Sequence, residues 1–260
     1  MSNMSKGKTM KVYGITGSIA CGKSTVTHYL IERGYLVVDA DLISRNALTI
    51  DQECILKVQE LFGCVKDGIV DRKALGRIVF HDKNAKKQLE AIIHPYVIFK
   101  MKEEIEKNKE RDCIFLDIPL LYESHLEYLC DEIIVVYLDE QRQVQRLMAR
   151  DHIDESYAYT IINNQISSLK KREMADIVFD NNQGIEELYK QIDEFIERIS
   201  DHWMYFDQDG LSHNGWLELN GKKYYLNPIT GYMVSNETVK IDNGYYKFNK
   251  DYIGYTADTV

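Results

Sequence analysis

A short segment near the start of the chain has the residue types and the spacing that bind phosphate groups. Residues 17–25 read GSIACGKST, which satisfies the pattern GxxxxGK[ST] between an apolar run and an amphipathic one. Gly17 and Gly22 let the backbone turn successive N–H groups toward an anion. We expect Lys23 to reach the β- and γ-phosphates of a nucleoside triphosphate, and Ser24 to offer its hydroxyl to Mg²⁺. A chance match is the alternative, but the flanking patterns favour a phosphate-binding loop.

Two carboxylates follow the next apolar run. Asp39 and Asp41 belong to the segment VVDAD, and ligands of open α/β sheets bind at the carboxyl ends of the strands. A hydroxyl group that accepts a phosphoryl group needs a carboxylate to orient it and to take its proton. Asp41 lies beyond the strand, at a helix start, and is our candidate base, while Asp39 is placed to support the water shell of Mg²⁺. The alternative is that Asp41 only caps the helix.

The elements that must position these residues follow an alternating pattern. Over the first 200 residues short apolar runs alternate with amphipathic segments, which is typical of an α/β fold with a parallel sheet. Five strands are predicted at 11–16, 35–38, 113–117, 132–138 and 176–180. Helices are predicted at 23–33, 52–62, 84–108, 140–150 and 185–199. With the loop, this predicts a fold of the P-loop nucleoside-triphosphate hydrolase type with a parallel five-stranded sheet.

Two polar insertions interrupt the alternation within a domain expected at 10–200. The first, at about 51–111, is longer than a crossover helix and is predicted to be a helical, acceptor-binding insertion. The second, at about 151–172, is predicted to be a lid. Two insertions beside one sheet edge are how a nucleotide kinase builds a substrate cap and a lid.

Composition excludes several classes of function. The 260 residues contain 32 Lys and Arg against 41 Asp and Glu, so the net charge is −9 and there is no broad basic face for nucleic acid. No apolar run reaches about 18 residues, so no membrane association is expected. The polar first ten residues do not resemble a secretory signal, and five cysteines without a CxxC pair suggest free thiols. We therefore expect a cytoplasmic protein.

Further motifs occur in a fixed order along the chain. They are the DAD triplet with Ile43 and Arg45, HP at 94–95, DIPLL at 117–121 with Glu123, Arg146 with Arg150 and Asp151, and VFDNN at 178–182. With the phosphate-binding loop, this set closely resembles the dephospho-coenzyme A kinases over about residues 10–200. The resemblance implies phosphorylation of the ribose 3′-hydroxyl of dephospho-CoA, the last step of coenzyme A synthesis, with ATP as co-substrate and Mg²⁺. Another small-molecule kinase of the same fold is the alternative.

The resemblance also implies roles for individual residues. Asp41 would take the proton of the 3′-hydroxyl, Arg146 and Arg150 would approach the transferred phosphoryl group from the lid, and Asp180 to Asn182 would lie near the ATP base. Because Asp151 is adjacent, one arginine is alternatively a surface charge, and Arg150 is the preferred candidate. His94 and Pro95 alternatively only shape a helix start. The residues expected to hold ATP are Gly17, Ala20, Cys21, Gly22, Lys23, Ser24, Thr25, Asp180 and Asn182, and those expected beside the acceptor are Asp41, Arg45, His94, Pro119, Leu121 and Glu123.

The last 60 residues, 201–260, have a different character. Both tryptophans, Trp203 and Trp216, lie there, and Tyr-Tyr pairs at 224–225 and 245–246 recur with a period of roughly 20 residues, which predicts small stacked β-hairpins. This tail resembles the choline- or glucan-binding repeats of bacterial cell-wall-binding proteins. The resemblance implies an aromatic cage that includes Trp216, Tyr225 and Met233. The alternatives are that these side chains only pack together, that the tail docks a protein or mediates oligomerisation, or that the chain is a surface module with a vestigial kinase domain. The presence of Lys23, Ser24, Asp41 and Arg150 argues against the last alternative.

Overall fold

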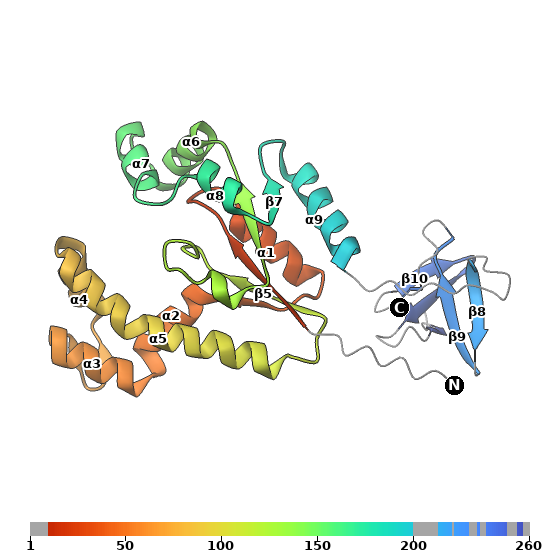
Figure 1. The fold of residues 1–260 in the computed structure, drawn as a ribbon, viewed down its shortest axis with the longest axis horizontal. Coiled ribbons are helices and arrows are strands. Elements are labelled where there is room, and N and C mark those ends of the chain that lie inside the picture. The colour runs from red at the N-terminus through yellow and green to blue at the C-terminus, as the bar shows by residue number, and fades with distance from the viewer. Residues whose placement is uncertain are drawn as a thin grey trace. The chain divides into compact units, whose positions relative to one another are not determined.

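The computed structural model describes residues 10–199, 213–219, 221–228, 233–234, 238–248 and 254–256 (Figure 1). The chain forms two compact units that divide between Phe195 and Ile196. We call the first the α/β unit and the second the tail, and each is described by itself.

A five-stranded parallel sheet forms the centre of the α/β unit. Its strands lie in the order β2-β5-β1-β6-β7. They are mostly runs of Val, Ile and other apolar residues that are buried on both faces, as in parallel sheets covered by helices. The sheet confirms the predicted fold class. The bounds of the strands are β1 Lys11–Thr16, β2 Val37–Asp39, β5 Cys113–Asp117, β6 Glu132–Tyr137 and β7 Ile177–Asp180.

Two helices that pack near one another belong to this core. Helix α1 (Lys23–Glu32) follows the phosphate-binding loop, and α9 (Ile185–Ile199) contacts it through stacked Tyr29 and Tyr189 rings, whose centroids are 4.0 Å apart. The ring of Phe195 on α9 packs edge-on against aromatic rings from three strands, those of Tyr13, Phe115 and Phe179. The helix predicted at 185–199 is therefore present and packs on the sheet.

The first insertion is helical, as predicted, but it begins earlier. Helix α2 (Ala40–Ile50) starts directly after β2, and α3 (Gln52–Phe62) follows it. A two-stranded hairpin, β3 (Val65–Lys66) with β4 (Ile69–Val70), leads to α4 (Arg72–His81) and to the long α5 (Lys83–Lys107). The sequence did not predict α4 or the hairpin, because short elements become stable through tertiary packing, here of α4 on α5 and of the hairpin on α2 and α3.

The segment predicted as a lid contains two short helices. After α6 (Glu140–Asp151) come α7 (Glu155–Ile162) and α8 (Ser168–Met174). Ala158 and Ile162 of α7 pack on Val144 and Leu147 of α6. Figure 1 shows the insertion (orange to yellow) and the lid (green) on the same side of the sheet.

The described part of the tail consists of antiparallel strands, as predicted. Strands β8 (Gly215–Leu219) and β9 (Lys222–Leu226) form a hairpin, and β10 (Thr238–Ile241), β11 (Gly244–Phe248) and β12 (Gly254–Thr256) form a second sheet. Val234, Ile241 and Phe248 make a small core. Trp203 and the residues at 207–210 and 229–231 lie outside the described residues. No helix in the described ranges is long and apolar enough to cross a membrane.

Candidate active site

The phosphate-binding loop requires glycine at both predicted positions. Gly22 has a left-handed backbone with φ of 97°, and it precedes the first turn of α1. A Cβ atom on Gly22 would lie 2.3 Å from Nδ2 of Asn181, and one on Gly17 would lie 2.5 Å from Sγ of Cys21. Larger residues would therefore push the loop away from its neighbours.

Three side chains hold this loop in place. Asn181, buried after β7, donates from Nδ2 to the carbonyl of Cys21 at 2.8 Å. From the lid, Gln165 accepts a hydrogen bond from the N–H of Ile19 at 3.0 Å. The hydroxyl of Ser18 donates to the carbonyl of Ile166 at 3.0 Å. The loop is thus tied to a strand end on one side and to the lid on the other.

Asp180, Asn181 and Asn182, at the end of β7, form different hydrogen bonds. We expected Asp180 and Asn182 beside ATP, but Oδ1 of Asp180 accepts hydrogen bonds from both N and Nδ2 of Asn182, at 2.9 and 2.8 Å. These two residues shape the turn, and Asn181 between them contacts the phosphate-binding loop. The three consecutive polar residues were visible in the sequence. The sequence did not show that Asn181 points toward the loop while Asp180 and Asn182 bond each other.

A buried carboxylate that we had not assigned a role pairs with the lysine of the loop. Nζ of Lys23 forms an ion pair with Asp117, the last residue of β5. Burial raises the pKa of Asp117, Lys23 opposes this rise, and the nearby charges of Asp39 and Asp41 add to it. The strand register pairs Asp39 with Asp117 directly. Asp117 could have been found from the sequence, because it ends a predicted strand in the same way as Asp39.

The two carboxylates after β2 have distinct structural roles. Oδ1 of Asp39 accepts a hydrogen bond from the N–H of Leu42 at 3.0 Å, so Asp39 is the N-cap of α2. Asp41 lies in the first turn of the helix with its side chain exposed. The alternative in which Asp41 is only the cap is therefore wrong, because the capping oxygen belongs to Asp39.

The two arginines of α6 are placed differently. Nη1 of Arg146 would lie 3.5 Å from a Cβ atom on Gly22, so Arg146 reaches the phosphate-binding loop. Arg150 forms a two-pronged ion pair with its neighbour Asp151, with distances of 2.7 and 2.8 Å. Arg146 is therefore the arginine beside the loop in this structure, and the preference for Arg150 stays a prediction. The ion pair with Asp151 is the interaction expected if Arg150 is a surface charge.

The loop after β5 is fastened to the lid by a buried lysine. Lys171 on α8 is fully buried, and its Nζ lies 2.9 Å from Oε1 of Glu123 and 3.3 Å from the carbonyl oxygen of Pro119. Oε1 of Glu123 also accepts from the N–H of Ile166 at 3.0 Å. Pro119 and Glu123, which we expected beside the acceptor, thus join this loop to the lid. The basic run around Lys171 was visible in the sequence, but its burial was not.

Leu121 requires a correction. We expected it to line the acceptor site, but its side chain is fully buried in the core and lies against Gly14 of β1. Within the motif DIPLL, Ile118 and Leu121 are buried and anchor the loop, whereas Leu120 is exposed.

His94 and Arg45 lie in the insertion, on the side of Asp41. His94 is exposed in the middle of α5 and lines a cavity of about 690 Å³ together with Ser44 of α2. The alternative in which His94 and Pro95 only start a helix is therefore wrong, because α5 begins at Lys83. The side chain of Arg45 is exposed, and its carbonyl accepts a hydrogen bond from Arg72 at 2.8 Å.

The oxygen atoms of the site fit a metal ion that is bound mainly by the phosphates of a substrate. Among the described residues no group of three or more His, Cys, Asp or Glu side chains could by itself hold a metal ion. The hydroxyl of Ser24 is exposed directly after Lys23, and the carboxylates of Asp39 and Asp117 lie at neighbouring strand ends. Hydroxyl and carboxylate oxygens beside a phosphate site suit Mg²⁺, which is bound through few protein ligands and substrate phosphates.

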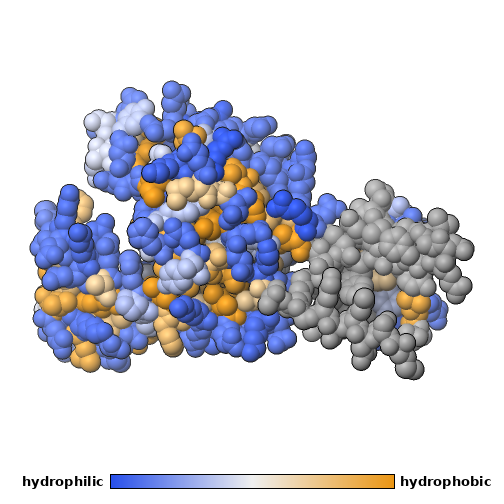
Figure 2. Space-filling view, in the orientation of Figure 1, coloured by the Kyte–Doolittle hydropathy of each residue, from blue (hydrophilic) through white to orange (hydrophobic). Residues whose placement is uncertain are grey.

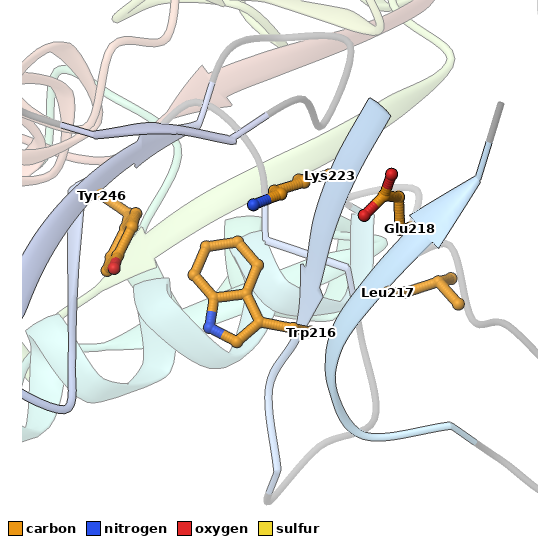
Figure 3. Close-up of a pocket in the computed structure, with 5 residues that line it drawn as sticks. All are labelled: Trp216, Leu217, Glu218, Lys223 and Tyr246. Carbon is orange, nitrogen blue, oxygen red and sulfur yellow. The ribbon is translucent and has the colours of Figure 1, made fainter. Parts of the chain in front are cut away.

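In the tail, aromatic rings pack together beside an open cavity. The ring of Trp216 lies edge-on to those of Tyr225 and Tyr246, with centroid distances of 5.2 and 4.8 Å. A cavity of about 430 Å³ is lined by Trp216, Leu217, Glu218, Lys223 and Tyr246 (Figure 3). Of the three expected cage residues, only Trp216 lines it. Met233 forms a backbone bridge to Leu226. Tyr246, from the second Tyr-Tyr pair, lines the cavity although no ligand role was predicted for it.

No disulfide joins any two of the five cysteines, as expected. Four are buried and Cys130 is half-buried. Burial raises the pKa values of Cys54 and Cys130 to about 12, so these thiols stay protonated at neutral pH.

Comparison with known proteins agrees with this site. Residues 11–187 match the family model of dephospho-CoA kinase, and residues 196–237 match that of the choline-binding repeat. The chain is 43% identical to a dephospho-CoA kinase of Oceanobacillus iheyensis over 192 residues, which cover 72% of this chain and 96% of the relative. It is 40% identical to one of Fusobacterium nucleatum over 197 residues, which cover 74% of this chain and 100% of the relative.

A solved structure gives the same result. The dephospho-CoA kinase of Campylobacter jejuni superimposes with a TM-score of 0.59 at 32% identity, covering 73% of this chain and 96% of that one. The chain therefore belongs to the dephospho-CoA kinase family, a family of transferases, and its tail is similar to choline-binding repeats.

Proposed function

We propose that this chain transfers the γ-phosphoryl group of ATP to the ribose 3′-hydroxyl of dephospho-CoA, forming CoA and ADP. The observation that carries this proposal is the meeting of three parts at one sheet edge. The phosphate-binding loop with Lys23, the exposed carboxylate of Asp41 and the cavity beside His94 lie along one path from the strand ends into the insertion. This path suits a nucleotide on one side and a hydroxyl acceptor on the other.

On the nucleotide side, the backbone N–H groups of the loop and Lys23 bind the phosphates. Lys23 exchanges its contact with Asp117 for the phosphate oxygens as ATP enters. Arg146 approaches over Gly22, where its planar guanidinium matches the oxygens of the transferred group. Ser24, with Asp39 or Asp117 acting through water, would hold Mg²⁺, which neutralises charge that develops on the phosphates.

On the acceptor side, Asp41 orients the 3′-hydroxyl and accepts its proton. The O–H bond of the ribose breaks as its oxygen forms a bond to the γ-phosphorus, and the bond to the ADP oxygen breaks. Asp41 suits this role because Asp39 caps the helix, which leaves the Asp41 carboxylate exposed beside the acceptor path.

The purified chain tests the proposal directly. Incubated with ATP, Mg²⁺ and dephospho-CoA, it is expected to form CoA, measured by chromatography. We expect Asp41→Asn to lower kcat by about 10²- to 10⁴-fold, because it removes the proton acceptor. Its dissociation constant for ATP, measured by calorimetry, should stay close to that of the unmodified chain.

The controls separate the proposed acceptor from others. Asp51→Asn, at the N-cap of α3, keeps a capping side chain and should lower activity far less than Asp41→Asn. Phosphorylation of adenosine or another hydroxyl compound in preference to dephospho-CoA would contradict the assignment and favour another small-molecule kinase. No transfer to any acceptor would favour a vestigial kinase domain.

The tail supports a second, separate activity. Its rings at Trp216 and Tyr246 face an open cavity, which suits a quaternary ammonium group such as choline or the face of a sugar ring. Titration of choline and of short glucans should change the tryptophan fluorescence of the unmodified chain, and not that of Trp216→Ala. No change at millimolar ligand would favour packing, protein docking or oligomerisation as the role of these side chains.

A further inference from the structure

One peptide group of the lid is hydrogen-bonded to two different loops of the site. The carbonyl oxygen of Ile166 accepts from the hydroxyl of Ser18, in the phosphate-binding loop, at 3.0 Å. The N–H of the same residue donates to Oε1 of Glu123, in the loop after β5, at 3.0 Å. Beside it, Oε1 of Gln165 accepts from the N–H of Ile19. Two consecutive residues of the lid therefore bond both to the phosphate-binding loop and to the loop after β5.

The side chain of Lys171 makes a second connection between the lid and these loops. It is fully buried on α8, and its Nζ lies 2.9 Å from Oε1 of Glu123 and 3.3 Å from the carbonyl oxygen of Pro119. That carbonyl also accepts, at 2.9 Å, from the hydroxyl of Thr16, which directly precedes the phosphate-binding loop. Burying an ammonium group carries a large desolvation cost, which an apolar side chain would avoid. Stability alone therefore does not explain a lysine at this position.

The carboxylate of Glu123 is held through one of its two oxygen atoms. Oε1 accepts from both Ile166 and Lys171, whereas Oε2 is buried and has no hydrogen-bond partner among the described residues. A buried carboxylate that loses its donors is costly. The loop after β5 is therefore expected to follow the lid whenever these two donors shift.

The loop after β5 borders both sides of the proposed reaction. Asp117, its neighbour at the end of β5, pairs with Lys23 of the phosphate-binding loop. The strand register also sets Asp117 opposite Asp39, at the strand end that leads to Asp41. Figure 2 shows the surface hollowed between the lid and the insertion, and the contacts at the base of the lid fix one side of this hollow.

We propose that Lys171 is a positioning residue that couples the binding of ATP to the binding of the acceptor. This inference rests on the proposed function. ATP phosphates that bind the N–H groups of the phosphate-binding loop fix Ser18 and Ile19, and these fix the base of the lid. Ile166 and Lys171 then fix the loop after β5. A second ligand that meets an ordered site loses less conformational entropy, so each substrate should tighten the binding of the other.

Calorimetry with a non-hydrolysable ATP analogue measures this coupling. In the unmodified full chain, we expect saturating dephospho-CoA to lower the dissociation constant of the analogue by about fivefold or more. The analogue should tighten dephospho-CoA by the same factor, as linkage requires. In Lys171→Met we expect the factor to fall to about one, because the connection to both loops is lost. Ser18→Ala removes the hydroxyl that bonds Ile166 and should lower the factor in the same direction.

A double variant separates positioning from stability. Lys171→Met/Glu123→Gln no longer buries an unpaired carboxylate, so we expect its Tm to exceed that of Lys171→Met. Its coupling factor should stay as low as in Lys171→Met, because the bonds from Nζ to Glu123 and Pro119 are still missing. Lys170→Met is the matched control, since Lys170 is the exposed neighbour on α8, and its Tm and coupling factor should match those of the unmodified chain.

The outcomes that would overturn the inference are specific. They are a coupling factor of one in the unmodified chain, equal factors in Lys171→Met and Lys170→Met, or a factor that recovers together with Tm in the double variant. If Lys171→Met does not fold, the double variant and Ser18→Ala decide the question. Failure of the unmodified chain to make CoA would instead contradict the proposed function, so the two failures are distinguishable.

Discussion

Lys23 and Asp117 make the central charge pair of the site, and its surroundings explain how a chain of net charge −9 binds polyphosphates. Asp117 is buried and the charges of Asp39 and Asp41 act on it, so negative charge gathers at this end of the sheet. The positive charges available to a nucleotide are therefore local, namely Lys23 and Arg146 with the N–H groups of the loop. Because low-dielectric surroundings strengthen such contacts, a few cations suffice without a basic face.

The two arginines of α6 give a prediction at this scale. We expect Arg146→Ala to lower kcat by roughly 10²- to 10³-fold, because a cation aimed at the transferred group is lost. Arg150→Ala should have little effect, since Arg150 already pairs with Asp151. Steady-state kinetics of CoA formation measure both. A larger loss for Arg150→Ala would mean that Arg150 leaves Asp151 and approaches the phosphates when substrates bind.

The buried pair of Lys171 and Glu123 gives a second prediction. Lys171→Met should lower the free energy of unfolding in urea by roughly 3 kcal/mol, because it leaves a largely buried carboxylate without its partner. Adding Glu123→Gln should restore part of this loss, which a double-mutant cycle measures. Strictly additive effects of the two substitutions would show that the pair is not coupled.

At the scale of elements, α2 leads from the sheet to the cavity of the insertion, and α4 lines that cavity. Helix α2 begins at Asp39 on a strand end and carries Asp41 and then Ser44 toward the cavity. Helix α4 contributes Phe80 to the cavity, and its start depends on Asp71, whose Oδ1 accepts from the N–H groups of Lys73 and Ala74. Both helices therefore depend on an aspartate cap.

The cap of α4 predicts a dependence on pH. The hydrogen bonds from Ala74 and Lys73 lower the pKa of Asp71, so the ionised cap stabilises the fold above pH about 4, the ordinary pKa of Asp. This contribution is lost as the pH falls through the lowered pKa. We expect Asp71→Ala to lower Tm at pH 7 and the difference from the unmodified chain to shrink in acid. Asp71→Asn, which still caps, should lose less at pH 7. A difference in Tm independent of pH would contradict this account.

At the scale of the whole molecule, the chain joins a complete kinase unit to a tail of different composition. The buried residues of α9, which include Phe195, belong to the core of the α/β unit. A chain that ends after Ile199 keeps all of α9, and we expect it to retain the kcat and both KM values of the full chain. Cutting before Ile185 should unfold the α/β unit, as measured by circular dichroism. Loss of activity on removing 201–260 alone would show that the tail contributes to catalysis.

Much of the fold and part of the site were predictable because they depend on local patterns. Val- and Ile-rich runs with intervening amphipathic helices specify a parallel sheet, and the glycines of the loop are required by backbone geometry at Gly17 and Gly22. Leu121 and Arg150 show the limit. Both lie in the right motifs, but a motif does not state whether a side chain points into the core or which neighbour it pairs with.

The sequence by itself determined that this chain has a phosphate-binding motif between a strand and a helix, and that it carries an aromatic β tail. Those features arise from residues close together in the chain. Only the tertiary structure decided that Asn181, Lys171 and Asp117 reach the site, because each comes from a segment far along the chain. The cavity of the insertion likewise exists only where α2, α4, α5 and the lid meet. Contacts between distant segments depend on packing, and no local pattern encodes them.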